Sequence, residues 1–382
     1  MTETRDDTAA AQHGDTRADQ ALTGLRVLDF TTVMAGPFCT RLLADLGADV
    51  IKVESPDGDH IRVRPPLRTG PHGPRSSYFG QLNCGKRSVV LNLKQPEDRA
   101  TALRMAGAAD VLVENFRPGV MDRLGLDYPT LAARHPGLVY CSISGYGQTG
   151  PASERPAYAP IIHAASGYDL TNLGYQDGVD TPPSTGVFIA DVFGGVYAFG
   201  AIQAALLHRA RTGTGQAVDV SLLETMLALQ VFEVQQAQFP GDRRRPLYRP
   251  LRTSDGHVVV APVSQRNFEH LITALGRPAW ADDPRFTTQS DREHHWDALL
   301  GLLEQWTVHR TALDCERTLL AAGVACSRYV RVAELLTDPQ LAHRGALATV
   351  RDSAGSFLVP NAPFRLSGGP VRAGAEVPEL GA

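Results

Sequence analysis

One acidic residue stands inside a long apolar stretch of the chain. Asp191 is the only charged residue between Gly186 and Leu207, in a run rich in Ala, Val, Phe, Ile, Leu and Gly. A buried carboxylate is costly unless it is paired or neutralised, and burial raises its pKa. A carboxylate kept in dry, apolar surroundings can act as a nucleophile, so Asp191 is a candidate reactive group.

Two other interpretations of this run stay open. Its length allows a membrane span, but Pro182 and Pro183 precede it and several glycines interrupt it, so we do not expect a membrane partner. Asp191 could instead be the N-cap of a buried helix over residues 192–207, where its oxygen would accept backbone N–H groups. A cap and a reactive role are compatible, because a helix start also offers N–H donors to a docked anion.

Several other chemistries lack their motifs. No GxSxG elbow is present, and the run Gly85-Lys86-Arg87-Ser88 has Arg87 where a phosphate-binding loop has Ser or Thr directly after its lysine. No GxGxxG follows the first expected strand, so a nicotinamide dinucleotide is not indicated. His294 and His295 form an isolated pair, and the five cysteines are scattered. We therefore expect no metal and reduced thiols.

The elements that must position Asp191 alternate between strand and helix. Residues 25–30 predict a buried strand, Ala35-Gly36-Pro37 opens a helix, and residues 49–54 predict a second strand. Further short strands are expected at 88–93, 111–114, 138–143 and 217–222. This alternation predicts an α/β fold with a doubly wound, Rossmann-like parallel sheet, which binds ligands at the carboxyl ends of its strands.

The chain is long enough for more than one domain. A basic, proline-punctuated stretch around Arg243–Arg245 reads as a connector, although a phosphate-binding patch is the alternative. The expected organisation is a disordered tail (1–22), a large ligand-binding Rossmann-like domain (23–235), a linker (236–250), a small α+β domain (251–330) and a C-terminal segment returning to the large domain (331–382).

Loops with Lys, Arg and Asn adjoin the expected strands. Residues 83–88 precede one strand, Lys94 follows it, residues 114–119 follow another, and Arg123 lies in the next helix. Such loops suit a nucleotide with several phosphates, although a helix cap or a surface charge explains each one alone. The formal charge of −4 gives no reason to expect nucleic acid or an anionic membrane. The N-terminus shows no apolar signal core, so we expect a cytoplasmic protein.

Taken together, these motifs resemble the class III CoA-transferases, the CaiB/BaiF family that includes formyl-CoA and carnitine CoA-transferases. The resemblance extends from about Gly24 to Pro370 and rests on many short motifs in the right order. They are residues 24–29, 35–37, 43–54, 58–59, 83–91, 113–119, 144–147, 166–167, Asp191 with Gly194 and Gly195, 211–216 and 338–341.

The resemblance implies a large Rossmann-like domain, a small domain, and a homodimer of two interlocked rings. It implies acyl-CoA and a carboxylic acid as substrates, with no permanently bound cofactor. Asp191 takes the place of the catalytic aspartate. The other implied positions are Lys94, Asn115, Phe116 and Arg123 along the CoA site, Ala35 over the reacting carboxylate, and Met34 and Tyr158 near the acyl group.

In the chemistry that this family suggests, the aspartate carboxylate attacks the thioester and passes through a mixed anhydride to an aspartyl-CoA thioester. Both intermediates hydrolyse readily, so the site must exclude water. Each addition creates an oxyanion that needs N–H donors. Gly194 and Gly195 are candidates for that role, and close helix packing explains these two glycines equally well.

Some positions depart from formyl-CoA transferase. Met34 replaces a Gln and cannot donate a hydrogen bond to a small carboxylate, so formyl or oxalyl groups are not expected. Ser55 replaces an Arg that helps to hold the nucleotide. Plausible acid-binding groups elsewhere are His163, Tyr168, Tyr175 and the loop at 263–266, where Arg266 would suit a second carboxylate.

Two alternative functions remain open. α-Methylacyl-CoA racemase shares the fold and uses a His/Asp pair as acid and base, but Tyr158 stands where that His is expected. His163 lies five residues further on. The other alternative is a CoA-thioester binding protein without turnover.

Overall fold

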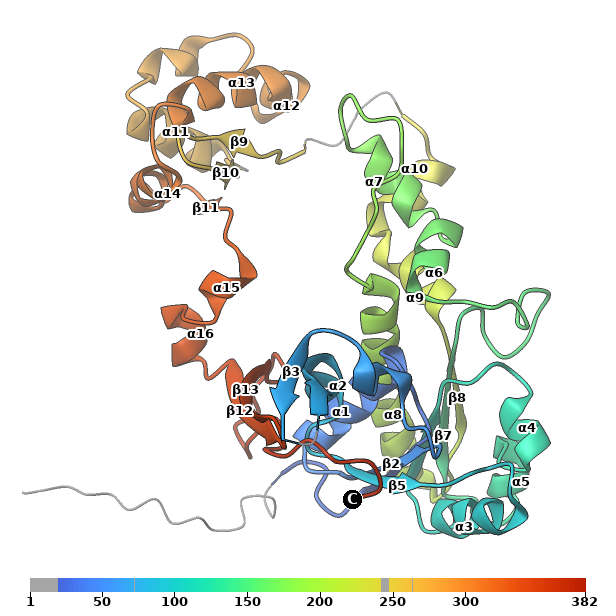
Figure 1. Cartoon of the computed structure of the whole chain (residues 1–382). Helices are drawn as coiled ribbons and strands as arrows, with labels where there is room; N and C mark the ends of the chain where they lie inside the picture. The colour runs from blue at the N-terminus through green and yellow to red at the C-terminus, as the bar shows by residue number, and fades with distance from the viewer. Residues whose placement is uncertain (1–19, 72, 242–246, 263) are drawn as a thin grey trace, which may run out of the picture. The chain divides into compact units, whose positions relative to one another are not determined.

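The computed structural model describes residues 20–71, 73–241, 247–262 and 264–382 (Figure 1). The chain divides into two compact units, one formed by residues up to 238 together with 340–382, and the other by residues 239–339. Most of the expected tail, the Arg243–Arg245 connector and Val263 lie outside the described residues. Leu22 is described, and its N–H donates to the Leu46 carbonyl at 2.9 Å.

A parallel sheet forms the centre of the first unit. Within the described residues it has six strands, and every pairing is parallel, which confirms the predicted α/β class. The order in which the chain adds strands reverses between β1 and β6, and loops at such a switch point diverge to leave room for a ligand. The spatial order is β5 (Arg87–Val90), β2 (Asp49–Glu54), β1 (Arg26–Asp29), β6 (Val111–Glu114), β7 (Val139–Ser144) and β8 (Ala217–Ser221).

Helices cover both faces of this sheet, because successive side chains of a strand point to opposite faces. On one face, Val27, Val111 and Val139 pack in a single core with helices α1, α6, α8 and α9. On the other face, Leu28 and Leu112 pack with α3, α4 and α5, which gather together in Figure 1. The helices are α1 (Ala35–Asp45), α3 (Pro96–Ala106), α4 (Val120–Leu124), α5 (Tyr128–Ala132), α6 (Ala159–Ala165), α8 (Ile189–Thr212) and α9 (Leu222–Leu229).

The last part of the chain joins the same unit. Val350 and Val359 pack against Phe79 and Leu82 in a separate core. The carbonyl of Ala382 accepts a hydrogen bond from the Ser88 N–H, beside strand β5 (Figure 1). The elements not yet named in this unit are η1 (His60–Val63), β3 (Leu67–Gly70), β4 (Gly73–Ser76), α2 (Ser77–Asn83), α7 (Tyr168–Gly174), α10 (Val231–Gln238), β12 (Leu347–Asp352) and β13 (Gly355–Pro360).

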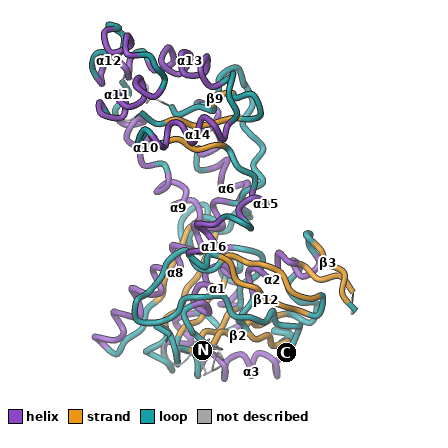
Figure 2. The backbone as a smooth tube through the Cα atoms, turned by 90° about the vertical axis from the view of Figure 1, so that its left-hand side faces the viewer, coloured by secondary structure: helices purple, strands orange, loops and turns teal. Residues whose placement is uncertain are grey.

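The second unit has its own core. A small antiparallel sheet and the helices beside it (Figures 1 and 2) enclose a core that contains Phe268, Phe286 and Leu299. Its elements are β9 (Leu251–Arg252), β10 (His257–Val260), α11 (Gln265–Ala274), η2 (Pro278–Asp282), α12 (Gln289–His294), α13 (Trp296–Thr307), α14 (Ala312–Ala321), β11 (Cys326–Arg328) and α15 (Val332–Leu335). Helix α16 (Pro339–His343) begins at the boundary between the units.

Helix α8 is the apolar run that surrounds Asp191. Among the described residues it is the one helix long and apolar enough to cross a membrane by length and composition, with a mean hydropathy of 1.5. Its face with Ala190, Gly194, Ala198 and Ile202 is buried against the sheet and α1. One face of α8 thus packs in the core, which explains the apolar residues on that face, whereas Val196, Tyr197 and Leu207 are exposed in the single chain.

Candidate active site

Asp191 lies in the first turn of α8 and does not cap it. Phe188 is the N-cap residue, and its side chain makes no capping hydrogen bond. The predicted Asp191 cap is therefore wrong. The cap comes from another helix, because Nε2 of His163 in α6 accepts the Ala190 N–H at 3.1 Å. That outside acceptor lets α8 begin before Asp191 and leaves the carboxylate free.

The Asp191 carboxylate has no hydrogen bond or ion pair to any residue that the structure describes. Burial raises the pKa of Asp191 to about 6. Tyr78 in α2 is close enough to feel this charge, since burial, Asp191 and Asp59 together raise the pKa of the Tyr78 phenol to about 12. The phenol therefore stays neutral and can donate a hydrogen bond near the carboxylate. Sequence reasoning missed Tyr78, whose neighbours in sequence carry no chemical pattern.

Gly194 and Gly195 bring α8 against α1. A Cβ on Gly195 would lie 2.6 Å from the Ala35 carbonyl oxygen, and one on Gly194 would lie 2.2 Å from a Leu222 methyl carbon. Both glycines stand beyond the first turn of α8, where backbone N–H groups donate to carbonyls within the helix. The two glycines therefore have a packing role. Their N–H groups are already bonded within the helix and are not available to stabilise an oxyanion.

The loop between β1 and α1 lies beside this part of α8. Met34 is the N-cap of α1 and Ala35 is its first residue, buried next to Gly194 and Gly195. Val33 has φ of 67°, which is rare for a β-branched residue and indicates backbone strain. Strain of this kind persists only where surrounding contacts hold it, and it is frequent at functional sites.

Three side chains hold that strained loop. Asn115, just after β6, exchanges two hydrogen bonds with the Thr32 backbone at 2.9 and 2.8 Å. Lys52 Nζ donates to the Thr31 carbonyl at 2.6 Å, and it pairs with Asp59 at 3.2 Å. The Asp59 carboxylate accepts the Val33 N–H at 3.3 Å. Asn115, expected along the CoA site, is therefore also a clamp at the switch point of the sheet.

The segment at residues 83–88 carries two cations, of which Arg87 is exposed and pairs with Asp49, whereas Lys86 is not accessible to a ligand. Lys86 is fully buried and pairs with Asp29 at 3.0 Å, while its Nζ also donates to Thr40 and Asn83. Lys86, with Lys52 and two threonine hydroxyls, outweighs burial and holds the pKa of Asp29 at about 2. The interpretation of Lys86 as a possible phosphate contact is therefore wrong, because Asp29, which is distant in the sequence, takes up its charge.

The other expected CoA positions lie after β5 and β6. Lys94 and Arg123 are exposed. Phe116 is half-buried against the core under α4, and its N–H donates to Glu114 at 2.9 Å. Tyr158, expected near the acyl group, is the N-cap of α6 and is 66 % exposed. The structure thus brings Met34, Ala35 and Asn115 to one loop and leaves Lys94, Arg123 and Tyr158 at the surface.

The expectation that His163 binds the acid is wrong, because this side chain is fully buried and hydrogen-bonded to α8. Tyr175 donates its phenolic hydrogen to Glu233. Arg266 is exposed at the start of α11, in the second unit. Of the residues that the structure describes, no three His, Cys, Asp or Glu side chains lie close enough together to hold a metal ion.

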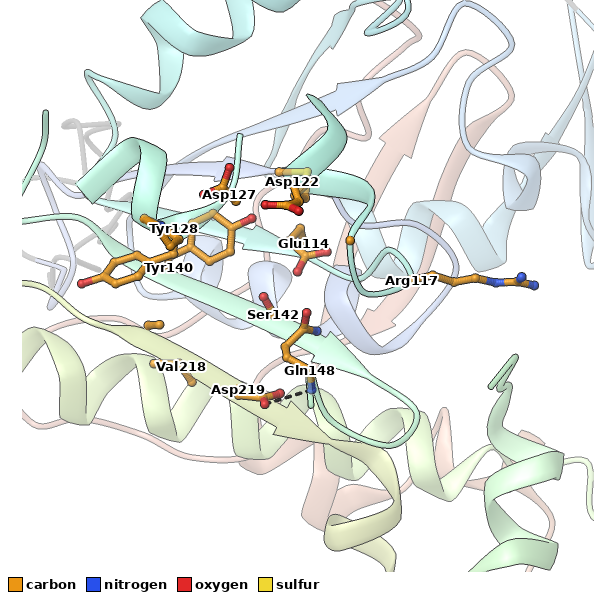
Figure 3. A pocket seen from close by; sticks show the side chains of 14 residues that line it. Glu114, Arg117, Asp122, Asp127, Tyr128, Tyr140, Ser142, Gln148, Val218 and Asp219 are labelled. Carbon is orange, nitrogen blue, oxygen red and sulfur yellow. Dashed lines mark hydrogen bonds between the residues drawn. The ribbon is translucent and has the colours of Figure 1, made fainter. Parts of the chain in front are cut away.

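A cavity of about 470 Å³ lies elsewhere in the first unit (Figure 3). Glu114 and Ser142 point into it from β6 and β7, and Asp219 on β8 accepts the Gln148 N–H at 3.0 Å. Burial raises the pKa of Glu114 to about 7. These side chains stand on the sheet face that α4 and α5 cover, whereas α8 covers the opposite face. The cavity is therefore separate from Asp191.

Comparison with known proteins agrees with this geometry. The family model described as CoA-transferase family III matches residues 22–382. The chain is 40% identical over 358 residues to an acetyl-CoA:oxalate CoA-transferase of Acetobacter aceti, covering 90% of this chain and 89% of that protein. It is 35% identical over 381 residues to a succinate–glutarate CoA-transferase of Agrobacterium fabrum, covering 94% and 93%.

A solved structure leads to the same assignment. The crystal structure of a CaiB/BaiF family protein from Brucella suis superposes with a TM-score of 0.83 at 36% sequence identity. The match covers 95% of this chain and 97% of that one. The similarity in sequence and in fold therefore extends over nearly the whole length of both proteins. The chain belongs to CoA-transferase family III.

Proposed function

We propose that this CoA-transferase works through a covalent intermediate on Asp191. The observation that carries the proposal is the state of this carboxylate: it lies in the first turn of a core helix, unpaired within the described residues, with its pKa raised to about 6 by burial. Near neutral pH it is ionised and poorly solvated, which favours attack on a carbonyl carbon.

The proposed steps balance without any outside reagent. An Asp191 oxygen attacks the acyl-CoA carbonyl and the carbon–sulfur bond breaks. CoA leaves as a thiolate, and a mixed anhydride between Asp191 and the donor acyl group remains. The thiolate attacks the aspartyl carbonyl, which releases the donor acid and leaves an aspartyl-CoA thioester. The acceptor carboxylate then attacks this thioester, and the returning thiolate takes the acceptor acyl group and frees Asp191.

Two neighbours support these steps. The neutral Tyr78 phenol is a hydrogen-bond donor near the carboxylate and can stabilise developing negative charge. Met34 and Ala35 bring an apolar side chain and a helix start to the same region. We place the CoA moiety along Asn115, Phe116, Arg123 and Lys94, where the two exposed cations would meet its phosphates.

For the acids, we propose short dicarboxylates. The similar proteins are named for oxalate and for succinate and glutarate, which all carry two carboxylates. A third, 36% identical over 377 residues, is a succinyl-CoA:mesaconate CoA-transferase of Haloarcula marismortui. Oxalate belongs among the candidates although Met34 led us to expect otherwise.

The racemase alternative has less support. Its histidine must be a free base beside the substrate, whereas His163 has its Nε2 lone pair engaged by the Ala190 N–H. Tyr158 is a phenol, which is a poor base near neutral pH.

The test is an exchange assay followed by trapping. Acetyl-CoA or succinyl-CoA is mixed with ¹³C-labelled oxalate, glutarate or mesaconate, and new thioesters are identified by mass spectrometry. Quenched enzyme is then digested to find CoA or hydroxamate on the peptide that contains Asp191. We expect the adduct there, and Asp191→Asn should abolish both adduct and exchange. An adduct on another residue, or exchange by the Asn variant, would disprove the proposal.

We also propose a homodimer. Val196, Tyr197 and Leu207 on the core helix α8 are 45, 46 and 69 % exposed in the single chain, which is unfavourable for large apolar side chains. Light scattering coupled to gel filtration should give twice the mass of the chain. A monomer that retains full activity would contradict this.

A further inference from the structure

The start of helix α8 depends on a side chain from outside the helix. The first N–H groups of a helix have no partner within it and need acceptors. Phe188, at the N-cap, has no acceptor in its side chain. His163 Nε2 accepts the Ala190 N–H at 3.1 Å, and both residues are fully buried. The other ring nitrogen, Nδ1, is also buried and has no hydrogen-bond partner among the described residues.

This contact determines the protonation of the ring. Because the backbone N–H donates, Nε2 must carry its lone pair, and the hydrogen of the neutral imidazole is on Nδ1. An imidazolium would put a second N–H against the Ala190 N–H and a positive charge at the positive end of the helix dipole. Burial lowers the pKa of His163, with Asp169 opposing, and this agrees with a ring that stays neutral.

The next residue along the helix is Asp191. Its carboxylate has no hydrogen bond or ion pair within the described residues, so its position depends on the backbone of this first turn and on the packing around it. Gly195, one turn later, rests against the Ala35 carbonyl. The turn is therefore held at its end by His163 and on its side by α1. A shift of the end would move the carboxylate directly.

We propose that His163 is a positioning residue, which holds the first turn of α8 through its neutral Nε2 and so directs the Asp191 carboxylate at the substrate. The proposal deepens the assigned chemistry and rests on Asp191 being the nucleophile. It predicts that an acceptor at the Nε2 position is required, whereas the ring itself is not. Misplacement of a reacting group by about 1 Å can cost on the order of a hundredfold in rate.

Three variants separate this role from simple packing. His163→Gln places an amide oxygen near the Nε2 position, His163→Asn is one carbon shorter and cannot reach Ala190, and His163→Leu fills the space without any acceptor. We expect the Gln variant to keep kcat within a few-fold of the unmodified chain. We expect kcat of the Asn and Leu variants to fall at least about tenfold, with KM for acyl-CoA little changed.

A second measurement does not depend on activity. Hydrogen exchange followed by mass spectrometry on a peptide spanning residues 186–195 should be faster in the Asn and Leu variants and unchanged in the Gln variant. If the Leu variant fails to fold, the Gln and Asn pair still carries the test. Equal kcat in all three variants, or an equal loss in Gln and Asn, would overturn the proposal.

The two proposals fail differently. If the unmodified chain transfers CoA but forms no adduct on Asp191, the covalent mechanism is wrong. This conclusion does not depend on the hydrogen-exchange result for residues 186–195. If the adduct forms normally, and the His163 variants form it at the same rate, only the positioning role is wrong.

Discussion

The side chain of Asn115 joins the two loops that diverge at the switch point of the sheet. Its Oδ1 accepts the Thr32 N–H at 2.9 Å, and its Nδ2 donates to the Thr32 carbonyl at 2.8 Å. Thr32 directly precedes the strained Val33, which leads into α1 beside Asp191. A single amide therefore links the end of β6 to the loop beside the reacting group.

Asn115→Asp should weaken this link, because a carboxylate oxygen would face the Thr32 carbonyl in place of a donor. We expect a loss of about 1–3 kcal/mol in the free energy of unfolding and a fall in kcat/KM on the order of tenfold or more. Urea denaturation and steady-state kinetics measure the two effects.

Asn361 offers a matched control for this change. Its Nδ2 donates to the Gly345 carbonyl and its Oδ1 accepts the Ala373 N–H, both at 2.8 Å, so it makes the same pair of backbone bonds far from the loop in sequence. Asn361→Asp should lose similar stability and keep its turnover. Equal turnover in the two variants would show that the Asn115 clamp has no bearing on catalysis.

The pH dependence of turnover should report Asp191. Attack requires the ionised carboxylate, and burial raises the pKa of Asp191 to about 6. We expect kcat/KM to be constant above that pH and to fall about tenfold for each unit below it. Glu114→Gln is the control, since it removes the other carboxyl with a strongly raised pKa and should keep the same acid limb. A limb that disappears in this variant would assign the titration to Glu114.

Ionisation of Glu114 should instead affect the free energy of unfolding. Its folded pKa of about 7 is above the ordinary 4.5, so Glu114 costs no stability below pH 4.5 and lowers the free energy of unfolding progressively as pH rises from 4.5 through 7. Glu114→Gln mimics the protonated group and should raise the free energy of unfolding at pH 8, by up to about 3 kcal/mol. The gain should shrink at pH 5.

Urea titrations at the two pH values test this expectation. Glu154→Gln, at an exposed carboxylate, is the control and should change little at either pH. A gain for Glu114→Gln that is the same at pH 5 and pH 8 would mean that ionisation of Glu114 is not its cause.

Local sequence patterns predicted much of the sheet. The expected strands at 49–54 and 111–114 match β2 and β6 to the residue, because each has β-branched or aliphatic residues in a short segment between helical segments. The start of α8 was predicted wrongly, since its cap comes from His163, 27 residues earlier in the chain. The sequence around Asp191 alone cannot indicate that His163 will lie next to it in the fold.

The same limit applies to the charged residues. Lys86 was interpreted as a possible phosphate contact, but it pairs inside the fold with Asp29, which lies 57 residues away. Tyr78 has no motif around it, and only the packing of α2 brings it near Asp191. Residue types indicated the chemistry of Asp191, whereas the partners of each buried charge depended on how distant segments meet.

Two glycines of α8 allow the contact between α8 and α1 to be tested within one helix. A Cβ on Gly195 would lie 2.6 Å from the Ala35 carbonyl oxygen, and backbone cannot move aside as a side chain can. Gly195→Ala should therefore push the first turns of α8 away from α1, with a loss of about 1–3 kcal/mol in the free energy of unfolding. It should also lower kcat, because Asp191 is one turn away.

At Gly200 a Cβ meets no described atom within 4 Å in the single chain, so Gly200→Ala should leave the contact between α8 and α1 unchanged and gain up to about 1 kcal/mol in the stability of the chain from helix propensity. Thermal unfolding and single-turnover kinetics on both variants measure this difference. A Gly195→Ala protein with normal stability and normal turnover would show that close approach of the two helices is not what places the carboxylate.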